Sequence, residues 1–507
     1  MPARDTAADV HRPRFHYTSA KHWINDPNGL IWLDGEYHLF YQHNPFGDQW
    51  GHMSWGHAVS TDLVSWQELP VAIAEDERVS IYSGSVVLDT DNRSGFGDGV
   101  TPPLVAIYTG CLRVPEGGQA QELAYSTDRG RTWTKYAHNP VLRAQVKDFR
   151  DPKVFWHAGT QRWVMAVVLP DARKAQFYGS ENLKAWTLLS EFEAPFEGQG
   201  IWECPDLLPL PVEGTEAGQG SSDDAVWLFK VDVFGGHPSG GTGARIFSGR
   251  FDGTHFHAHP QPAPQWADLG ADFYAALSWA GLPGADAHPP ARAVWLAWMN
   301  CHRYAQHTPT SPWRGAMSVP RELRWRRAAD GTWQLLQRPV PELNRLRGTP
   351  LALSMITLDS AVHDVLPPGC DGVALDIELQ IGPGHAERCG LQLRVGDAVG
   401  EFTEVGYDRT LGVVYIDRAH SGFQPPDDTL YARRHEAPVP APTDAAPLRL
   451  RVMLDACLLE VYAGDGEATI SDQLFPQPGS RGLRLFAHGG AASFGGVQVW
   501  PMAAAIG

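Results

Sequence analysis

Three carboxylates in the first half of the chain have neighbours that suggest chemistry. Asp26 lies in WINDPNG, Asp151 in FRDPKVFW and Glu203 in GIWECPDL, each at or beside the start of an apolar, strand-like stretch. The first two have a plainer explanation, because Asp-Pro is a common turn dipeptide and Asp151 could simply pair with Arg150. Glu203 resists such an explanation, since its Trp and Cys neighbours predict partial burial, and a buried carboxyl is costly unless paired or protonated.

These acids suit glycoside hydrolysis if the fold brings them together. That reaction uses two carboxyl groups on either side of the scissile bond: one attacks as a carboxylate, and the other stays protonated in apolar surroundings and protonates the leaving oxygen. A third carboxylate could hold sugar hydroxyls and stabilise the transition state. The Asn-Asp-Pro-Asn-Gly run is expected to be a turn that presents Asp26 at the inner edge of the fold.

A recurring segment predicts how the acids could meet. Each copy is an alternating strand followed by Ser, a polar turn and an aromatic residue, which is a hairpin pattern. Four copies occur, at residues 55–66, 123–133, 176–186 and 245–256, and there is room for a fifth. Their spacing of roughly 50 to 70 residues is typical of β-propeller blades with loops. Because the inner strands of a propeller line its central axis, we expect the three acids to converge there.

The pattern changes near residue 340. The segment PVPELNRLRGTP reads as a linker with a short helical turn, and short alternating strands beyond it predict an antiparallel β-sandwich. We therefore expect an all-β protein with a propeller over residues 1–340, a linker at 341–350 and a sandwich over 351–507.

Composition excludes several classes of protein. The 507 residues are 43% hydrophobic and 20% charged, as in globular proteins, and the formal net charge of −17 argues against nucleic acid as a partner. No apolar run approaches the length of a membrane span, and the N-terminus lacks the apolar core of a signal peptide, so a cytoplasmic protein is expected. The six cysteines are scattered without a CxxC pair, which predicts reduced thiols and no zinc site. We expect no metal and no cofactor, and association of identical chains is left open.

The motifs resemble glycoside hydrolase family 32, the β-fructosidases, which include invertases, exo-inulinases and levanases. The resemblance covers nearly the whole chain in the family's order. It rests on WINDPNG (23–29), YQHNP (41–45), WGH (55–57), YSGS (82–85), FRDP (149–152), WECPD (202–206), DFYA (272–275), WRGAMSVPREL (313–323), DRAHSG (417–422) and LEVYAGDGEATISDQLFP (459–476). It implies a five-bladed β-propeller followed by a β-sandwich.

The resemblance also implies roles for individual residues. Asp26 would be the nucleophile that forms a covalent fructosyl-enzyme, Glu203 the acid/base and Asp151 the transition-state stabiliser, kept ionised by Arg150. Positions that match contacts to the fructosyl ring, or aromatic positions near it, are Trp23, Asn25, Gln42, Trp50, Tyr82, Ser83, Arg150, Tyr274, Trp298 and Trp313.

One departure concerns the leaving group. Many members of the family that act on fructans read Trp-Met-x-Asn-Trp where this chain has Trp298-Met299-Asn300-Cys301-His302-Arg303-Tyr304. Either His302 or Arg303 stands in place of the second Trp, or both are simply exposed loop residues. The leaving-group preference is therefore open.

The sequence thus predicts a retaining, exo-acting β-fructofuranosidase. It would hydrolyse terminal non-reducing β-D-fructofuranosyl residues from sucrose and fructo-oligosaccharides, with inulin and levan as further substrates to test. The alternatives are a fructosyltransferase that uses the same covalent intermediate, and a non-catalytic fructan-binding propeller, against which the three intact acids argue.

Overall fold

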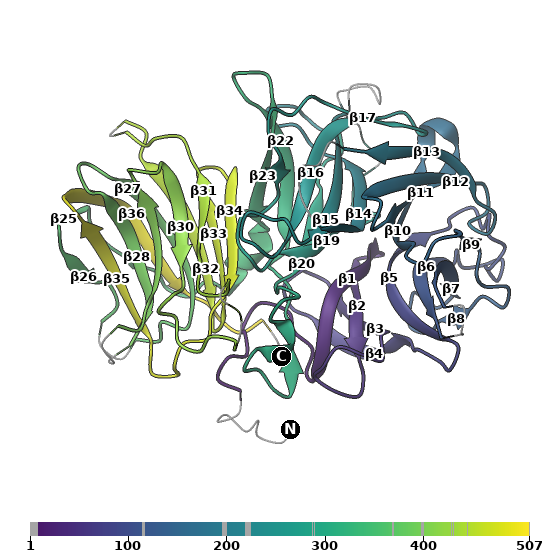
Figure 1. Cartoon of the computed structure of the whole chain (residues 1–507), viewed down its shortest axis with the longest axis horizontal. Helices are drawn as coiled ribbons and strands as arrows, with labels where there is room; N and C mark the ends of the chain where they lie inside the picture. The colour runs from purple at the N-terminus through teal and green to yellow at the C-terminus, as the bar shows by residue number, and fades with distance from the viewer. Residues whose placement is uncertain are drawn as a thin grey trace.

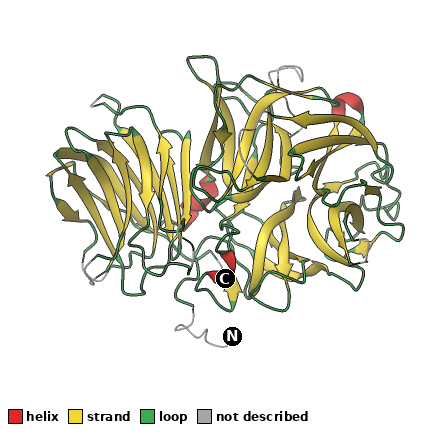
Figure 2. Cartoon of the chain, in the orientation of Figure 1, coloured by secondary structure: helices red, strands yellow, loops and turns green. Residues whose placement is uncertain are grey.

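The computed structural model describes residues 9–113, 117–194, 200–218, 225–285, 287, 289–367, 370–396, 400–426, 428, 430–443 and 445–505. Residues 1–8 and 506–507, at the ends of the two predicted domains, lie outside this part. Regular structure in the described residues is almost all β-strand, with short 3-10 helices (Figure 2): η1 (Ala158–Thr160), η3 (Ala305–His307) and η4 (Pro341–Leu346). No helix in these ranges is long and apolar enough to cross a membrane.

Strands up to β23 form five sheets in the described residues. The inner strands of the five sheets, β1, β5, β10, β14 and β19, meet near a common centre (Figure 1). The first sheet has the order β21 (Trp313–Arg314), β1 (His22–Leu33), β2 (Glu36–Asn44), β3 (Ser54–Ser60) and β4 (Gln67–Ile73). The second contains β5 (Val79–Leu88), β6 (Leu104–Leu112), β7 (Gln119–Ser126), β8 (Thr134–Lys135) and β9 (Leu142–Arg143), which also pairs with β7. The third contains β10 (Arg150–His157), β11 (Arg162–Leu169), β12 (Lys174–Ser180) and β13 (Thr187–Glu193).

Two more sheets complete this part of the molecule. The fourth contains β14 (Ile201–Pro209), β15 (Trp227–Phe234), β16 (Thr242–Phe251), β17 (Phe256–Ala258) and β18 (Gln265–Trp266), and the fifth contains β19 (Tyr274–Ser278), β20 (Val294–Trp298), β22 (Arg321–Arg327) and β23 (Trp333–Pro339). Successive strands within each of these sheets are mostly antiparallel neighbours, which is propeller topology.

The four repeated segments mark the outer hairpin of a sheet. They span the turns from β3 to β4, β7 to β8, β12 to β13 and β16 to β17. In the first copy the Asp62 side chain accepts hydrogen bonds from the backbone N–H groups of Val64 and Ser65, and Asn182 does the same in the third. Side chains of this kind favour turns because they satisfy local backbone donors. The fifth sheet has the same hairpin between β22 and β23, but it lacks the Ser, so the repeat pattern does not reveal it.

Beyond η4 two antiparallel sheets pack face to face. One has the order β24 (Leu351–Ala352), β36 (Ala491–Pro501), β27 (Ala374–Gly382), β32 (Leu448–Asp455), β33 (Leu458–Ala463) and β34 (Ala468–Gln473), with β25 (Ile356–Asp359) also on β36. The other has the order β26 (Val362–Asp364), β35 (Gly482–His488), β28 (Arg388–Val395), β29 (Thr403–Asp408), β30 (Val413–Asp417) and β31 (Arg434–Pro438). Alternate residues of both sheets fill one apolar core. The predicted all-β architecture, a propeller followed by a sandwich, is confirmed.

Buried charges join the propeller to the sandwich, which lie side by side in Figure 1. The guanidinium of Arg321 on β22 contacts Glu460 on β33 and Asp268, with all three side chains fully buried or nearly so. His16, in the segment before β1, contacts both Asp455 and Glu460. These side chains fix the position of the sandwich against the propeller.

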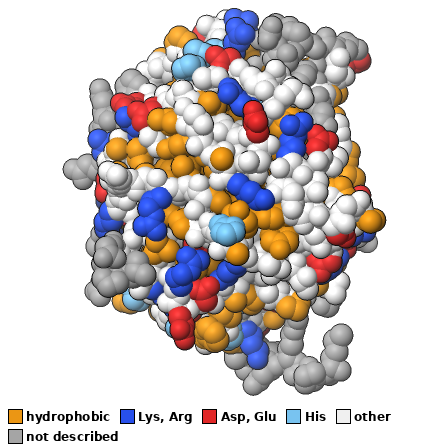
Figure 3. Space-filling model, turned by 90° about the vertical axis from the view of Figure 1, so that its right-hand side faces the viewer, with side chains coloured by type: hydrophobic (Ala, Val, Ile, Leu, Met, Phe, Trp, Pro, Cys, Tyr) orange, Lys and Arg blue, Asp and Glu red, His pale blue; other side chains and the backbone are white. Residues whose placement is uncertain are grey.

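The side of the propeller that faces away from the sandwich has no single electrostatic character. Apolar side chains run through the middle of this face, with basic and acidic ones scattered among them (Figure 3). The net charge of −17 is therefore not gathered into an acidic surface on this side.

Candidate active site

All five innermost strands of the propeller break their pairing register where the predicted site residues lie. The irregular stretches run between Ile24 and Pro27, Ile81 and Gly84, Arg150 and Lys153, Glu203 and Asp206, and Tyr274 and Leu277. A β-bulge of this kind re-aims side chains, and it tolerates proline because the missing N–H is not needed in the ladder. The bulges direct the three acids into one pocket.

The expected turn at Asn-Asp-Pro-Asn-Gly is wrong. Residues 22–33 form the continuous strand β1, and the Asp-Pro step lies within its bulge. Asp151 and Cys204 occupy the bulges of β10 and β14 with φ of 66° and 45°. These left-handed backbone values are uncommon for residues other than glycine, and they cluster at functional sites.

The acids share a pocket of about 340 Å³. Its described lining consists of Trp23, Asn25, Asp26, Gln42, Trp50, Tyr82, Ser83, Gln119, Arg150, Asp151, Glu203, His302, Ala305 and Gln306. The structure thus brings together all three predicted acids and seven of the ten predicted binding residues. Trp50 stands at the rim with 46% of its surface exposed and packs edge-on against Tyr82.

Asp26 is held by hydrogen bonds to both carboxylate oxygens. The Asn25 amide donates to Oδ1 at 3.0 Å, and the Ser83 hydroxyl donates to Oδ2 at 2.5 Å. The Cys204 sulphur lies 3.5 Å from Oδ2. Donors on two strands therefore fix the orientation of this carboxylate before substrate arrives.

Asp151 is buried beside Cys204. The Cys204 N–H donates to Asp151 Oδ2 at 2.9 Å, and the thiol lies 3.7 Å from the same oxygen. Burial, and then the charges of Asp151 and Asp26, raise the pKa of the Cys204 thiol well above its usual value, so the sulphur keeps its proton and donates.

Arg150 lies closer to Glu203 than to Asp151. Its Nη2 donates to Glu203 Oε1 at 2.9 Å, whereas its Nε lies 3.8 Å from Asp151 Oδ2. Burial raises the pKa of Asp151 to about 7, although Arg150 opposes this rise. Arg150 therefore does not keep the pKa of Asp151 in its usual range, as was expected of it, because burial outweighs the nearby cation.

Three predicted binding residues support the pocket without lining it. Tyr274 is buried, and its hydroxyl donates to Glu203 Oε2. Trp298 is fully buried, with its ring 5.9 Å from that of Trp23. Trp313 lies further away: its indole N–H donates to Asp9, and its ring packs in a cluster that includes residues of the sandwich. These residues lie behind the described lining of the pocket and hold its wall in place.

Other pocket residues were missed or left open. Gln119 accepts hydrogen bonds from the Phe149 N–H and from Arg150, so it orients the arginine. No motif marks it in the sequence. His302 lines the pocket and packs against Trp298, with ring centroids 4.9 Å apart, so it is a wall residue and not a free loop residue. Arg303 instead pairs with Asp428 in the sandwich.

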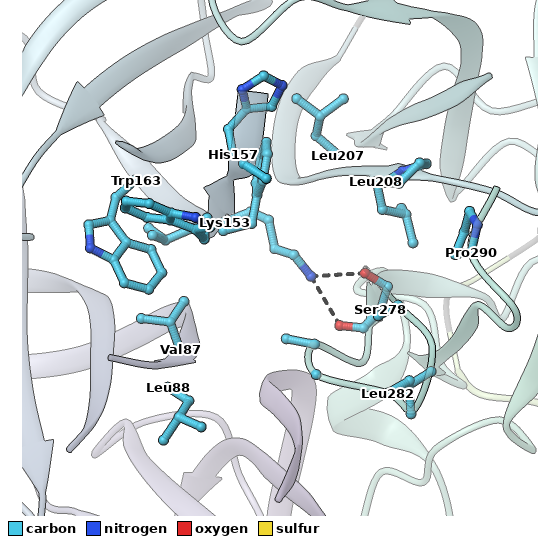
Figure 4. Close-up of a pocket in the computed structure, with 18 of the residues that line it drawn as sticks. Val87, Leu88, Lys153, His157, Trp163, Leu207, Leu208, Ser278, Leu282 and Pro290 are labelled. Atoms are coloured by element: carbon cyan, nitrogen blue, oxygen red, sulfur yellow. Dashed lines mark hydrogen bonds between the residues drawn. The ribbon is translucent and has the colours of Figure 1, made fainter. Parts of the chain in front are cut away.

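A larger cavity of about 1140 Å³ is lined by the same inner strands further along the axis. Figure 4 shows Lys153 reaching across it toward Ser278, to which its ammonium donates two hydrogen bonds. The labelled walls are mainly apolar, and none of the three acids lines this cavity. The smaller pocket is therefore the candidate active site, because the three acids line it and do not line the larger cavity.

The pocket contains the carboxyl groups and hydrogen-bond donors that glycoside hydrolysis needs. Asp26 is oriented for attack, Glu203 is hydrogen-bonded on both oxygens by Arg150 and Tyr274, and Asp151 is buried next to both. Short polar side chains around them can bind sugar hydroxyls, and the indoles supply an apolar wall.

Comparisons with known families match both domains of the chain. Residues 16–339 match the glycosyl hydrolases family 32 N-terminal domain, and residues 342–501 match the family 32 C-terminal domain. A levanase of Bacillus subtilis is 44% identical over 497 residues, which is 97% of this chain and 70% of that protein. An extracellular exo-inulinase of Aspergillus niger is 37% identical over 519 residues, which is 95% of this chain and 92% of that protein.

Solved structures give the same answer for the fold. The crystal structure of an exo-inulinase from Aspergillus awamori superimposes with a TM-score of 0.87 at 33% identity, covering 98% of this chain and 99% of that one. A β-fructofuranosidase from Schwanniomyces occidentalis complexed with fructosyl-erythritol gives a TM-score of 0.85 at 29% identity, covering 99% of each chain. With both domains matched and the acid cluster assembled, this chain belongs to glycosyl hydrolase family 32.

Proposed function

We propose that this protein is an exo-acting β-fructofuranosidase that removes terminal β-D-fructofuranosyl residues from fructans and sucrose with retention of configuration. The observation that carries the proposal is the convergence of Asp26, Asp151 and Glu203 in one small pocket. Its volume is at the lower end of the range of ligand sites, which suits a terminal sugar better than the middle of a chain. The relatives named levanase and exo-inulinase support fructans as substrates.

The reaction proceeds in two steps on these residues. Asp26 forms a bond to the anomeric carbon C2 while the glycosidic C–O bond breaks. Glu203, which has to carry a proton when substrate is bound, gives that proton to the leaving oxygen. Water then attacks C2 and gives a proton to Glu203, and the bond between C2 and Asp26 breaks. Asp151 binds fructosyl hydroxyls and stabilises the oxocarbenium-like charge at each transition state.

Rates and products on a substrate panel test the proposal. Sucrose, kestose, raffinose, inulin and levan should each release fructose, and NMR should detect the β-anomer first. Asp26→Asn and Glu203→Gln should each reduce turnover by at least about 1000-fold while the folded state persists. Near-normal rates in either variant would refute the assignment.

Transfer to sugar is distinguished by the products from sucrose. Equal amounts of glucose and free fructose indicate hydrolysis, whereas a large excess of glucose indicates a fructosyltransferase. Binding of sucrose without release of any reducing sugar would leave only a fructan-binding role.

A further inference from the structure

A buried lysine–aspartate pair lies on the strand next to Glu203. Lys230 and Asp232 on β15 have fully buried side chains, and Lys230 Nζ lies 2.6 Å from Asp232 Oδ2. β15 pairs with β14 so that Asp232 is opposite Glu203, and the bulge of β14 begins at that point. Neither member of the pair is among the described residues that line the pocket, so neither is placed to touch substrate.

The lysine also holds the bulge itself. Its ammonium donates to the backbone carbonyl of Cys204 at 2.6 Å. Cys204 has a left-handed φ of 45°, a strained backbone value that persists only where the surroundings impose it. The same residue directly follows Glu203 and gives its N–H to Asp151. One ammonium group thus fixes the Cys204–Pro205 peptide, which lies one residue after the acid/base.

Stability alone gives little reason for this pair. Burying two charges costs desolvation energy, and replacing a buried ion pair by packed apolar side chains is often neutral or stabilising. Burial raises the pKa of Asp232 to about 8, Lys230 opposes the rise, and Asp26 and Glu203 add to it. A second buried pair, Lys153 with Asp206, lies nearby at 3.0 Å.

We propose that Lys230, anchored by Asp232, is a positioning residue that holds the Cys204 bulge and thereby orients Glu203 for proton transfer. This inference rests on the function proposed above. Lys230 and Asp232, which are buried outside the pocket, would thus contribute to the step that protonates the leaving group.

The test compares two substrates that differ in their need for acid catalysis. Sucrose requires protonation of its leaving oxygen, whereas p-nitrophenyl β-D-fructofuranoside has a leaving group that departs with little help. In Lys230→Met, kcat/KM for sucrose should fall about 100-fold, and the loss on the aryl fructoside should be about tenfold smaller. Equal losses on the two substrates, or no loss, would overturn the proposal.

Two further variants test whether the effect is specific to Lys230 and whether it depends on leaving Asp232 buried without a partner. Lys153→Met removes the other buried lysine, whose partner Asp206 ends the same bulge. Lys153 makes no described hydrogen bond to Cys204, so if the contact with Cys204 is what orients Glu203, this variant should show no selective loss on sucrose. The same selective loss there would overturn the proposal. Lys230→Met/Asp232→Leu removes both charges together, so it should fold even if the single variant does not. It should show the selective loss, and its absence would count against the proposal.

Assays of the wild-type protein distinguish a failure of the proposed function from a failure of the positioning role of Lys230. If it releases no fructose from any substrate, the proposed function fails, whatever the variants do. If it is active on both substrates while the Lys230 variants show no selective loss, only the positioning role fails.

Discussion

His16 should make the stability of the joined domains depend on pH. Its imidazole is fully buried, with Nδ1 3.0 Å from Asp455 Oδ2 and Nε2 2.9 Å from Glu460 Oε1. Burial alone would lower the pKa, but hydrogen bonds and charges of the two carboxylates raise it to about 9 from the ordinary 6.5. The folded state therefore binds a proton that the unfolded chain releases above pH 6.5.

The size and sign of the effect follow from linkage. A rise in pKa from 6.5 to about 9 corresponds to roughly 3 kcal/mol of folding free energy. Because the pKa is raised on folding, this contribution is complete below pH 6.5, declines as the pH rises, and is lost above about 9. His16→Gln cannot carry the charge, so the variant should lack this part of the pH dependence.

Urea unfolding at pH 6.0 and pH 9.5, followed by tryptophan fluorescence, measures the effect. The gap in unfolding free energy between wild type and His16→Gln should be about 3 kcal/mol larger at pH 6.0 than at pH 9.5. Titrating groups that do not interact with His16 cancel in this difference. His363→Gln, at an exposed position on β26, serves as the control and should show no gap at either pH. A gap for His16→Gln that is equal at both pH values would refute the reasoning.

Three further substitutions have definite expected outcomes. Tyr274→Phe removes the hydroxyl that donates to Glu203, so kcat should fall roughly 10- to 100-fold without a comparable loss in thermal stability; an unchanged kcat would show that the bond is idle. Trp50→Ala removes an exposed rim indole, so KM for sucrose should rise roughly 3- to 10-fold, while the unfolding free energy changes by less than about 0.5 kcal/mol. Arg321→Met leaves Glu460 buried without its closest cation, so urea unfolding should show a loss of about 3–5 kcal/mol; a loss below about 1 kcal/mol would contradict the buried pair.

Much of the fold could be predicted because local chemistry repeats. The Ser, Asp or Asn and aromatic residues of each copy make a hairpin through contacts within a few residues, so the pattern survives without knowledge of the tertiary structure. The Asp34-Gly35 turn is equally local, with both residues at positive φ between β1 and β2. The fifth hairpin was hidden because β22 and β23 are joined without the serine.

Residues of the site could be predicted only where they lie within a recognisable sequence motif. The neighbours of Glu203 predict partial burial, which its half-buried side chain confirms, and the resemblance supplies most of the pocket. The partners of Arg150 could not be predicted, because its choice between Asp151 and Glu203 depends on how two different sheets approach each other. The packing of Trp313 could not be predicted for a similar reason, since the residues that cover it come from the far end of the chain.

The error at Asn-Asp-Pro-Asn-Gly has a more general explanation. Asp-Pro predicts a turn because proline lacks a donor and aspartate tolerates unusual backbone angles. A bulge inside a strand makes the same two demands, since it leaves one residue outside the ladder. At Asp26-Pro27 and Asp151-Pro152 the irregularity that relieves the ladder is also what turns the carboxylate toward the axis. Turn residues set within an apolar, alternating stretch therefore indicate a bulged inner strand, and a carboxylate among them is the side chain that the bulge exposes to substrate.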